Sequence, residues 1–392
     1  MNGAATNPDQ NGQTRPHQLP SAALNSAPSK FNSAPIKLNS AHLKSELMHP
    51  RGDFGRVDVV DSAGSTNTDL AAGAADVQQY FPSLSVLIAD AQPAGKGRLG
   101  RAWEVPAGAA MISSVLVWPG EQCAAGESGV ANPTETAFAA PGYGWLSILA
   151  GVALCQALRT LTGVPATLKW PNDVVVNGKK LAGILAQVVP KPMAPTSQMP
   201  TSQVPTSAGQ TAHQLSGAHT SGSHPSQAQP SQAQPSAVTG RVGERTQSGI
   251  GVVVGVGVNV SAEQTDLPTD RATSLLIEGV QGSGLDRNVL LSAYLNNFAR
   301  LYQAFVAVGG NAQAPLQGGA SAVDLARNLM STLGQEVRAE LPGDTLLYGT
   351  AVDLNSDGSL LLRDAAGTEH TVSAGDVVHL RRTGPDGALG YA

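Results

Sequence analysis

The segment Thr167–Leu185 constrains the fold most, because it is expected to contain several short strands joined by a corner and a tight turn. The apolar runs Val174–Val176 and Leu181–Leu185 flank Asn177-Gly178. An Asn-Gly pair between two such runs is the strongest short signal for a tight β-hairpin. Just before the hairpin lies Lys169–Asp173, whose proline fixes its own φ and favours an extended residue before it. The sequence therefore predicts a β-sheet with a rigid corner that carries a cation and a carboxylate.

The lysine of this corner has two interpretations. Lys169 is a candidate for neutralising a phosphate or a developing negative charge, because the stiff backbone holds it in place. Alternatively, it is a lysine at the end of a strand whose ammonium simply reaches water.

A glycine-rich basic loop follows the apolar run Val86–Ala89. Between Gly95 and Trp103, three glycines alternate with Lys96, Arg98 and Arg101. Glycine lets the backbone approach a ligand closely, and the cations supply donors for phosphate or carboxylate oxygens. We expect an anionic ligand to order this loop.

The same glycines match the dinucleotide fingerprint in spacing only. That fingerprint requires a helix to open at the third glycine. After Gly100, however, the chain has Trp103, Pro106 and Gly108 and no apolar helical stripe. We therefore reject a nicotinamide or flavin site here.

Composition excludes several classes of protein. A formal net charge of −5 gives no sign of nonspecific binding to nucleic acid or to an anionic membrane. Cys123 and Cys155 make neither a disulfide framework nor a metal-binding spacing. Residues 1–20 are polar and carry no secretory signal, and the apolar run Ile250–Val260 is too short to span a bilayer. A cytoplasmic protein is expected.

The chain divides into three predicted regions. Residues 1–54 are rich in Asn, Ser, Pro, Ala and Gln and are expected to be a disordered tail without the helices of a DNA reader. Residues 55–320 form the main domain, and residues 321–384 a small C-terminal one. Inside the main domain, residues 120–142 are expected to be a surface insertion.

A second insertion is the Pro/Ser/Gln/Thr segment 190–248, which cannot bury enough apolar surface to fold. It separates the apolar strands Leu181–Val188 and Ile250–Val260. We interpret them as neighbours in one sheet, since loop closure costs grow slowly with loop length. A linker between domains is the alternative.

Apolar spacing predicts long helices over Trp145–Leu161 and Asp286–Val308 and a short one over Asn67–Ala75, where Ser65 is either a simple N-cap or a ligand contact. Five short strands after Glu336, separated by glycine turns, predict a small β-barrel of SH3-like size.

Taken together, the motifs resemble those of the biotin–protein ligases. They are, in order, Ser65-Thr66-Asn67, Gln92 with the loop Gly95–Trp103, the corner Lys169–Asp173, Leu181–Ile184 and Gly255–Asn259. The resemblance implies an α+β fold. A mixed β-sheet catalytic domain with helices packed on it, similar to class II synthetases, precedes a C-terminal SH3-like β-barrel.

The resemblance also implies a reaction. Biotin attacks the α-phosphate of ATP, with Mg²⁺, to give biotinyl-5′-AMP and pyrophosphate. A lysine of a biotin carboxyl carrier domain then takes the biotin. No DNA and no membrane partner is expected, and the type implied is monofunctional, without a DNA-binding domain.

Site residues follow from the same resemblance. Lys169 and Arg98 are the expected catalytic residues. The expected biotin-binding residues are Ser65, Thr66, Asn67, Gln92, Lys96, Gly97, Arg98, Lys169 and Gly183. The expected ATP- or adenylate-binding residues are Arg98, Arg101, Trp103, Asn172, Asp173 and Asn259, with no dedicated protein metal site. Lys96 stands where the family has an arginine, which keeps the charge but loses the bidentate fork.

Three alternatives remain open: a lipoate or octanoate ligase or transferase, a biotin-responsive repressor, and a biotin-binding module without catalysis. The acid that the enzyme activates distinguishes a lipoate or octanoate enzyme from a biotin ligase. A specific shift of DNA would identify a repressor. Binding of biotin without formation of an adenylate would identify the non-catalytic module.

Overall fold

The computed structural model describes residues 36–120, 138–192, 249–341, 345–373, 376–382 and 389–391. Residues 36–392 form one compact unit, and all that follows concerns it. The centres of both predicted insertions, 121–137 and 193–248, lie outside the described residues.

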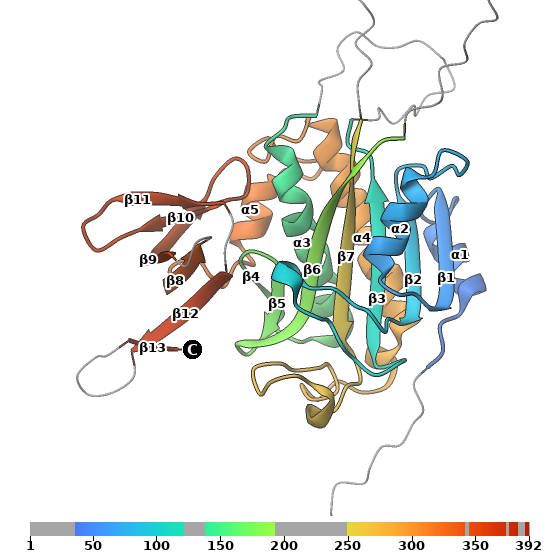
Figure 1. The fold of residues 1–392 in the computed structure, drawn as a ribbon, viewed down its shortest axis with the longest axis horizontal. Helices are drawn as coiled ribbons and strands as arrows, with labels where there is room; N and C mark the ends of the chain where they lie inside the picture. The colour runs from blue at the N-terminus through green and yellow to red at the C-terminus, as the bar shows by residue number, and fades with distance from the viewer. Residues whose placement is uncertain are drawn as a thin grey trace, which may run out of the picture. The chain divides into compact units, whose positions relative to one another are not determined.

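A mixed sheet forms the centre of the fold (Figure 1). In the described part of the chain its seven strands have the spatial order β1-β2-β3-β7-β6-β5-β4. Only β1 and β2 pair in parallel. The strands are β1 (Arg56–Ser62), β2 (Ser85–Ala91), β3 (Ala110–Val117), β4 (Thr167–Lys169), β5 (Asp173–Val176), β6 (Lys179–Pro190) and β7 (Ile250–Asn259).

Strands β6 and β7 are antiparallel neighbours, as predicted. Their register runs from Ala182 opposite Val258 to Pro190 opposite Ile250. Beyond the last pair, Lys191 N still donates to Gly249 O at 2.9 Å. The long segment between them is therefore an insertion in a hairpin, and the interdomain alternative is wrong.

The tight turn between β5 and β6 is also confirmed. Asn177 has φ 50° and Gly178 φ 78°. Two successive positive φ angles match the right-handed twist of the strands they join. This turn brings β6 back beside the corner, which lies between β4 and β5.

Helices cover both faces of the sheet. Val252, Val254 and Val256 of β7 belong to the large core beneath α3 and α4, whereas Val253 packs with Leu70 of α2 on the other face. The helices are α1 (Ser40–Leu47), α2 (Thr66–Ala75), α3 (Gly142–Thr162), α4 (Arg287–Ala307) and α5 (Ala322–Arg327), with single turns η1 (Arg98–Gly100), η2 (Gln264–Asp266) and η3 (Gly282–Leu285).

Helix α3 is the central core helix. Among the described residues it alone is long and apolar enough to cross a membrane, and 67% of its apolar stretch is buried inside the fold. Gly163, with φ 72°, ends it in the left-handed conformation common after helices.

A second, antiparallel sheet follows, with the order β11-β10-β9-β8-β12-β13. Together with the mixed sheet it confirms the predicted fold class. Its strands are β8 (Glu336–Leu341), β9 (Thr345–Leu354), β10 (Leu360–Arg363), β11 (Glu369–Val372), β12 (Asp376–Arg382) and β13 (Leu389–Tyr391).

The predicted start of the ordered chain at residue 55 is wrong. Helix α1 precedes it, with Leu43 and Leu47 fully buried. Asn39 caps this helix, and its backbone N–H donates to Asn288 Oδ1 at 2.7 Å. A helix this short has a weak local pattern and is stabilised by packing against α4.

The other predicted boundaries shift as well. Ser331 N donates to Leu168 O and Leu168 N to Leu329 O, so the chain up to residue 331 pairs with β4 of the main sheet rather than with the C-terminal sheet. Strand β13 extends the C-terminal sheet beyond residue 384. Phe138, inside the first predicted insertion, packs edge-on against Tyr143 and Phe305.

Candidate active site

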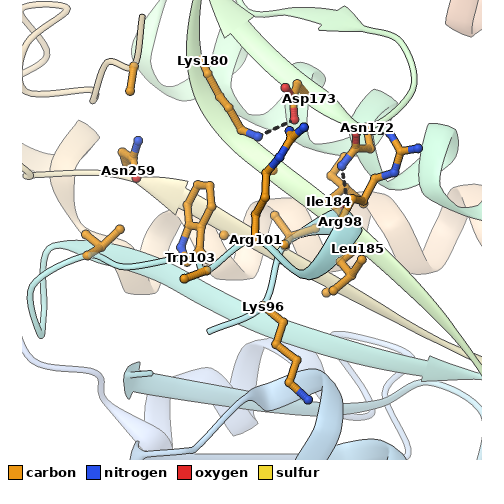
Figure 2. A pocket seen from close by; sticks show the side chains of 18 of the residues that line it. Lys96, Arg98, Arg101, Trp103, Asn172, Asp173, Lys180, Ile184, Leu185 and Asn259 are labelled. Atoms are coloured by element: carbon orange, nitrogen blue, oxygen red, sulfur yellow. Dashed lines mark hydrogen bonds and ion pairs between the residues drawn. The ribbon is translucent and has the colours of Figure 1, made fainter. Parts of the chain in front are cut away.

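A cavity of about 540 Å³ lies over β6 and β7, between the glycine-rich loop, the start of α2 and the corner (Figure 2). Every predicted site residue lines it: Ser65, Thr66, Asn67, Gln92, Lys96, Gly97, Arg98, Arg101, Trp103, Lys169, Asn172, Asp173, Gly183 and Asn259. Segments more than 190 residues apart in the sequence thus meet at one place.

Glycines on two strands form a seat for Trp103. Gly183 and Gly257 are register partners on β6 and β7. A Cβ on Gly257 would lie 2.8 Å from Trp103 Cε2, and one on Gly183 would lie 3.3 Å from Trp103 Cζ3. The indole therefore lies against bare backbone, and its buried Nε1 has no hydrogen-bond partner in the structure. Trp103 therefore anchors the end of the loop on β6 and β7.

The loop closes as a narrow turn. Gly97 N donates to Arg101 O at 2.7 Å, and Trp103 N to Gly95 O at 2.9 Å. Its tip is the single turn η1, in which Leu99 has φ 56°. No α-helix opens after Gly100, which agrees with rejecting the dinucleotide fingerprint.

The cations around the cavity are held in different ways (Figure 2). Arg98 Nη1 donates to Asn172 Oδ1 at 3.2 Å, and the Asn172 amide donates to Ile184 O at 2.7 Å. Lys180 Nζ lies 2.7 Å from Asp173 Oδ1 and 5.8 Å from the centre of the Trp103 ring. In contrast, Lys96 points away from this group and its ammonium donates to Thr68 Oγ1 at 3.0 Å.

A hydrogen-bonded network forms the end of the cavity at α2. Thr66 donates through both its backbone N–H and its hydroxyl to Gln92 Oε1, at 2.8 and 3.0 Å. Ser65 occupies the N-cap position of α2 but makes no capping bond with its side chain. The simple capping interpretation of Ser65 is therefore wrong, and Ser65 is one of the residues that line the cavity.

Asn67 is held by the protein on both sides of its amide. Its Nδ2 donates to Leu185 O at 2.9 Å, and its Oδ1 accepts from Ser114 Oγ at 2.6 Å. A Cβ on Gly255 would lie 2.0 Å from Asn67 Oδ1, so β7 needs glycine at this point. Asn67 thus ties α2 to β6 and β3.

Two residues of the site escaped the sequence analysis. Lys180 lines the cavity and pairs with Asp173, and buried Ser114 supports Asn67. The signals were present but weak. Ser114 is a polar residue within an otherwise apolar strand, and Lys180 follows the tight turn directly before Leu181–Ile184.

The far wall comes from the segment after β7. Lys180 N donates to Arg271 O and Thr273 N to Lys180 O, which docks residues 271–273 on β6. Buried Asn259 donates to Thr273 O at 2.9 Å, while its Oδ1 has no partner in the structure. The Asn259 and Trp103 side chains therefore border the cavity, while Asn259 Oδ1 and Trp103 Nε1 are both buried without a hydrogen-bond partner.

The charge around the cavity is predominantly positive. Its lining carries Lys96, Arg98, Arg101, Lys169 and Lys180 against Glu104, Asp173 and Glu340. Within the described ranges, no group of three or more His, Cys, Asp and Glu residues could hold a metal ion. The cavity therefore suits an anionic ligand.

The molecule thus combines a cation-rich cavity on a mixed sheet with a small antiparallel domain that follows it. Residues 60–198 match the Biotin/lipoate A/B protein ligase family, and residues 332–380 match the Biotin protein ligase C terminal domain. The chain belongs to the biotin protein ligase family.

The relatives support this assignment. The chain is 34% identical over 342 residues to the biotin–[acetyl-CoA-carboxylase] ligase of Mycobacterium tuberculosis, covering 86% of this chain and 93% of that protein. It is 24% identical over 81% of its length to the bifunctional ligase/repressor BirA of Bacillus subtilis, of which it covers 71%. The biotin protein ligase from Aquifex aeolicus, solved with biotin and ATP, shares the fold with a TM-score of 0.50 at 20% identity, over 83% of this chain and 98% of that one.

Proposed function

We propose that this chain is an ATP-dependent biotin–protein ligase. It activates biotin as biotinyl-5′-AMP with release of pyrophosphate and transfers the biotin to a lysine of a biotin carboxyl carrier domain. The carrier domain we propose is that of acetyl-CoA carboxylase, and the location we propose is the cytoplasm. The observation that carries the proposal is the convergence of Lys169, Lys180 and Arg98 on one cavity in a chain of this family.

The first half-reaction brings two anions together. A carboxylate oxygen of biotin attacks the α-phosphorus of ATP, the bond to the β-phosphate oxygen breaks, and pyrophosphate leaves. Preorganised cations offset the repulsion between carboxylate and phosphate and stabilise charge in the transition state. Lys169 was the expected residue for this role, and the position of Lys180 beside Asp173 and Trp103 supports a share for it.

The uncharged head of biotin suits the end of the cavity near α2. Its ureido ring offers two N–H donors and one carbonyl acceptor. Ser65, Thr66 and Gln92 supply hydroxyl and amide groups of both kinds there. Gly97 leaves the loop backbone open to the ring, and the tail is expected to pass beside Gly183, whose backbone also contacts Trp103.

The nucleotide suits the opposite side. Arg101 and Arg98 supply charge for phosphates, and the Trp103 and Asn259 side chains border the place for a base. Asn172 and Asp173 border this region, and Mg²⁺ would be part of the ATP substrate, with the Asp173 carboxylate within reach of such an ion.

The test is biotin transfer. The purified protein is incubated with ATP, Mg²⁺ and a carrier domain, and the mass of the carrier is measured with biotin, lipoate or octanoate as the acid. A mass increase of one biotin on one lysine is expected. Modification by lipoate or octanoate alone would assign the chain to the sister activities, and binding of biotin without any transfer would indicate a non-catalytic module.

A further inference from the structure

A second, smaller cavity of about 240 Å³ lies beside the first. The two share a wall made by Arg98, Trp170, Pro171, Asn172, Ile184 and Leu185. The remaining lining comes from the first turns of α3, from the turn between β9 and β10, and from Ala186 of β6 and Ser373 after β11. This cavity therefore lies where the C-terminal domain meets the corner.

The smaller cavity runs from solvent to the shared wall. At its outer rim Ala186, Asp357 and Ser373 are exposed. At its inner end Trp170 and Ile184 are only 3% and 2% exposed. It thus forms a passage that begins at the surface and ends against the candidate active site.

The shared wall has one fixed part and one part that belongs to the loop. Asn172 is fixed, because its amide donates to Ile184 O at 2.7 Å. Arg98, which closes the wall by donating to Asn172 at 3.2 Å, belongs to the glycine-rich loop. Movement of the loop would therefore open the wall between the two cavities, while Asn172 and the rest of the corner stay in place.

The passage carries a charge gradient. Among the described residues that line it, Asp357 at the rim is the one acid and Arg98 at the inner end the one base. The Ser359 hydroxyl and backbone N–H both donate to Asp357 Oδ1, and they hold the pKa of that carboxyl below its usual range. The rim therefore attracts a cation, while Ile148 and Trp170 farther in suit a methylene chain.

We propose that this passage admits the side chain of the acceptor lysine during the second half-reaction. An ammonium on four methylenes matches an anionic rim and an apolar middle, and its end would reach the shared wall. The inference rests on the proposed function, since it requires an activated acid in the larger cavity.

The transfer step joins the lysine nitrogen to the acyl carbon of biotin and releases AMP. The lysine loses one proton to water at the rim, and its free amine attacks the acyl carbon of the mixed anhydride. The C–N bond forms, the C–O bond to the phosphate breaks, and AMP leaves with the electron pair. The second amine proton is released to solvent. Entry from this side requires the Arg98 side chain to leave Asn172 and open the shared wall, while the backbone of the glycine-rich loop remains over the adenylate and excludes water.

A reversible block of the passage tests this directly. Ser147, on the wall contributed by α3, is changed to Cys in a Cys123→Ser background and capped with a methanethiosulfonate reagent that dithiothreitol removes. The remaining Cys155 is fully buried, and burial raises the pKa of its thiol to about 12, so it stays unmodified in the folded protein. Ser45→Cys on the exposed face of α1, capped in the same way, is the control.

Both half-reactions are measured, as biotin-dependent pyrophosphate exchange and as biotin transfer to a carrier domain. Capping Ser147→Cys should slow transfer by about tenfold or more and leave exchange unchanged, with recovery after dithiothreitol. Unchanged transfer would overturn the proposal. A parallel loss of exchange would overturn it too, because the passage would then serve the acid or the nucleotide.

A charge variant gives an independent check that does not depend on filling the cavity. Asp357→Asn keeps the oxygen that accepts from Ser359 but removes the charge. The KM for the carrier domain should rise about two- to fivefold at low salt, with exchange unaltered. An unchanged KM would contradict the role of the rim. If the unmodified protein shows no exchange at all, the proposed function itself has failed, and that result is visible before any variant is made.

Discussion

At the scale of single residues, Lys169 and Lys180, two of the three lysines that line the cavity, are distinguished by their surroundings. Lys180 is paired with Asp173 above Trp103, whereas Lys169 ends strand β4 at the corner. We expect Lys180→Ala and Lys169→Ala each to lower biotin-dependent pyrophosphate exchange by about a hundredfold or more, because each removes a preorganised cation. Lys179→Ala, at the exposed neighbouring position, should have no effect. Exchange at the full rate by Lys169→Ala would remove it from the catalytic residues.

The glycine seat makes a second prediction at this scale. Gly257→Ala brings a methyl group to 2.8 Å from the Trp103 indole, whereas Gly183→Ala brings one to 3.3 Å. Gly257→Ala should therefore displace the indole and weaken ATP binding more than Gly183→Ala does. The Kd values for ATP and for biotin, measured by calorimetry, provide the check. A larger loss with Gly183→Ala would contradict the contact geometry.

The residues that line the cavity could be predicted where they belong to a recognisable sequence motif. The loop cations, the corner and Ser65–Asn67 all line one cavity. Lys180 and Ser114 were not found, because their roles depend on partners that are close only in the fold: Asp173 across a hairpin for one, and Asn67 on α2 for the other.

At the scale of elements, the glycine-rich loop has a role that can be measured separately from substrate binding, namely retention of the biotinyl-adenylate intermediate. Its tip holds Arg98 against Asn172 at the shared wall of the two cavities. Arg98→Gly should release biotinyl-adenylate faster and label bystander lysines on added proteins, because the cover over the intermediate is lost. Lys96→Ala should retain the intermediate better than Arg98→Gly does, since the Lys96 ammonium donates to Thr68 and not to Asn172 at the shared wall. Equal retention by wild type and Arg98→Gly would count against a closing loop.

Elements with a strong local pattern were predicted within a few residues. The Asn177-Gly178 turn, the strands it joins and the long helices α3 and α4 are examples. Helix α1 was missed because only Leu43 and Leu47 of its eight residues are buried, and its stability comes from α4, about 250 residues away.

At the scale of the whole molecule, two tryptophans join the domains. Trp145 Nε1 on α3 donates to Ser356 O at 2.8 Å, and Trp170 Nε1 at the corner donates to Gly358 O at 3.0 Å. Both carbonyls belong to the turn between β9 and β10. This turn of the C-terminal domain therefore helps to hold the catalytic corner.

Substitution of these two tryptophans should affect stability and activity differently. Trp145→Phe and Trp170→Phe should each lower the free energy of unfolding by about 1–3 kcal/mol, because each leaves a carbonyl without its donor. Only Trp170→Phe should also reduce pyrophosphate exchange, since it alone lies in the corner. Urea unfolding and exchange rates on both variants provide the check, and equal losses of exchange would contradict this role for the corner.

The order of the domains was predictable, but their boundaries were not. The strand partners β6 and β7 were identified across a long low-complexity segment because both are strongly apolar. Residues 321–331 were assigned to the C-terminal domain because nothing in their sequence reveals that Leu329 and Ser331 bond to Leu168 of β4.

The most direct measurement is the exchange of labelled pyrophosphate into ATP by the purified protein with Mg²⁺, with biotin, lipoate or octanoate added separately. Exchange that requires biotin is the expected result, because it reports the reversible formation of biotinyl-5′-AMP in the cation-rich cavity. Exchange with lipoate or octanoate but not with biotin, or no exchange with any acid, would contradict the proposed function.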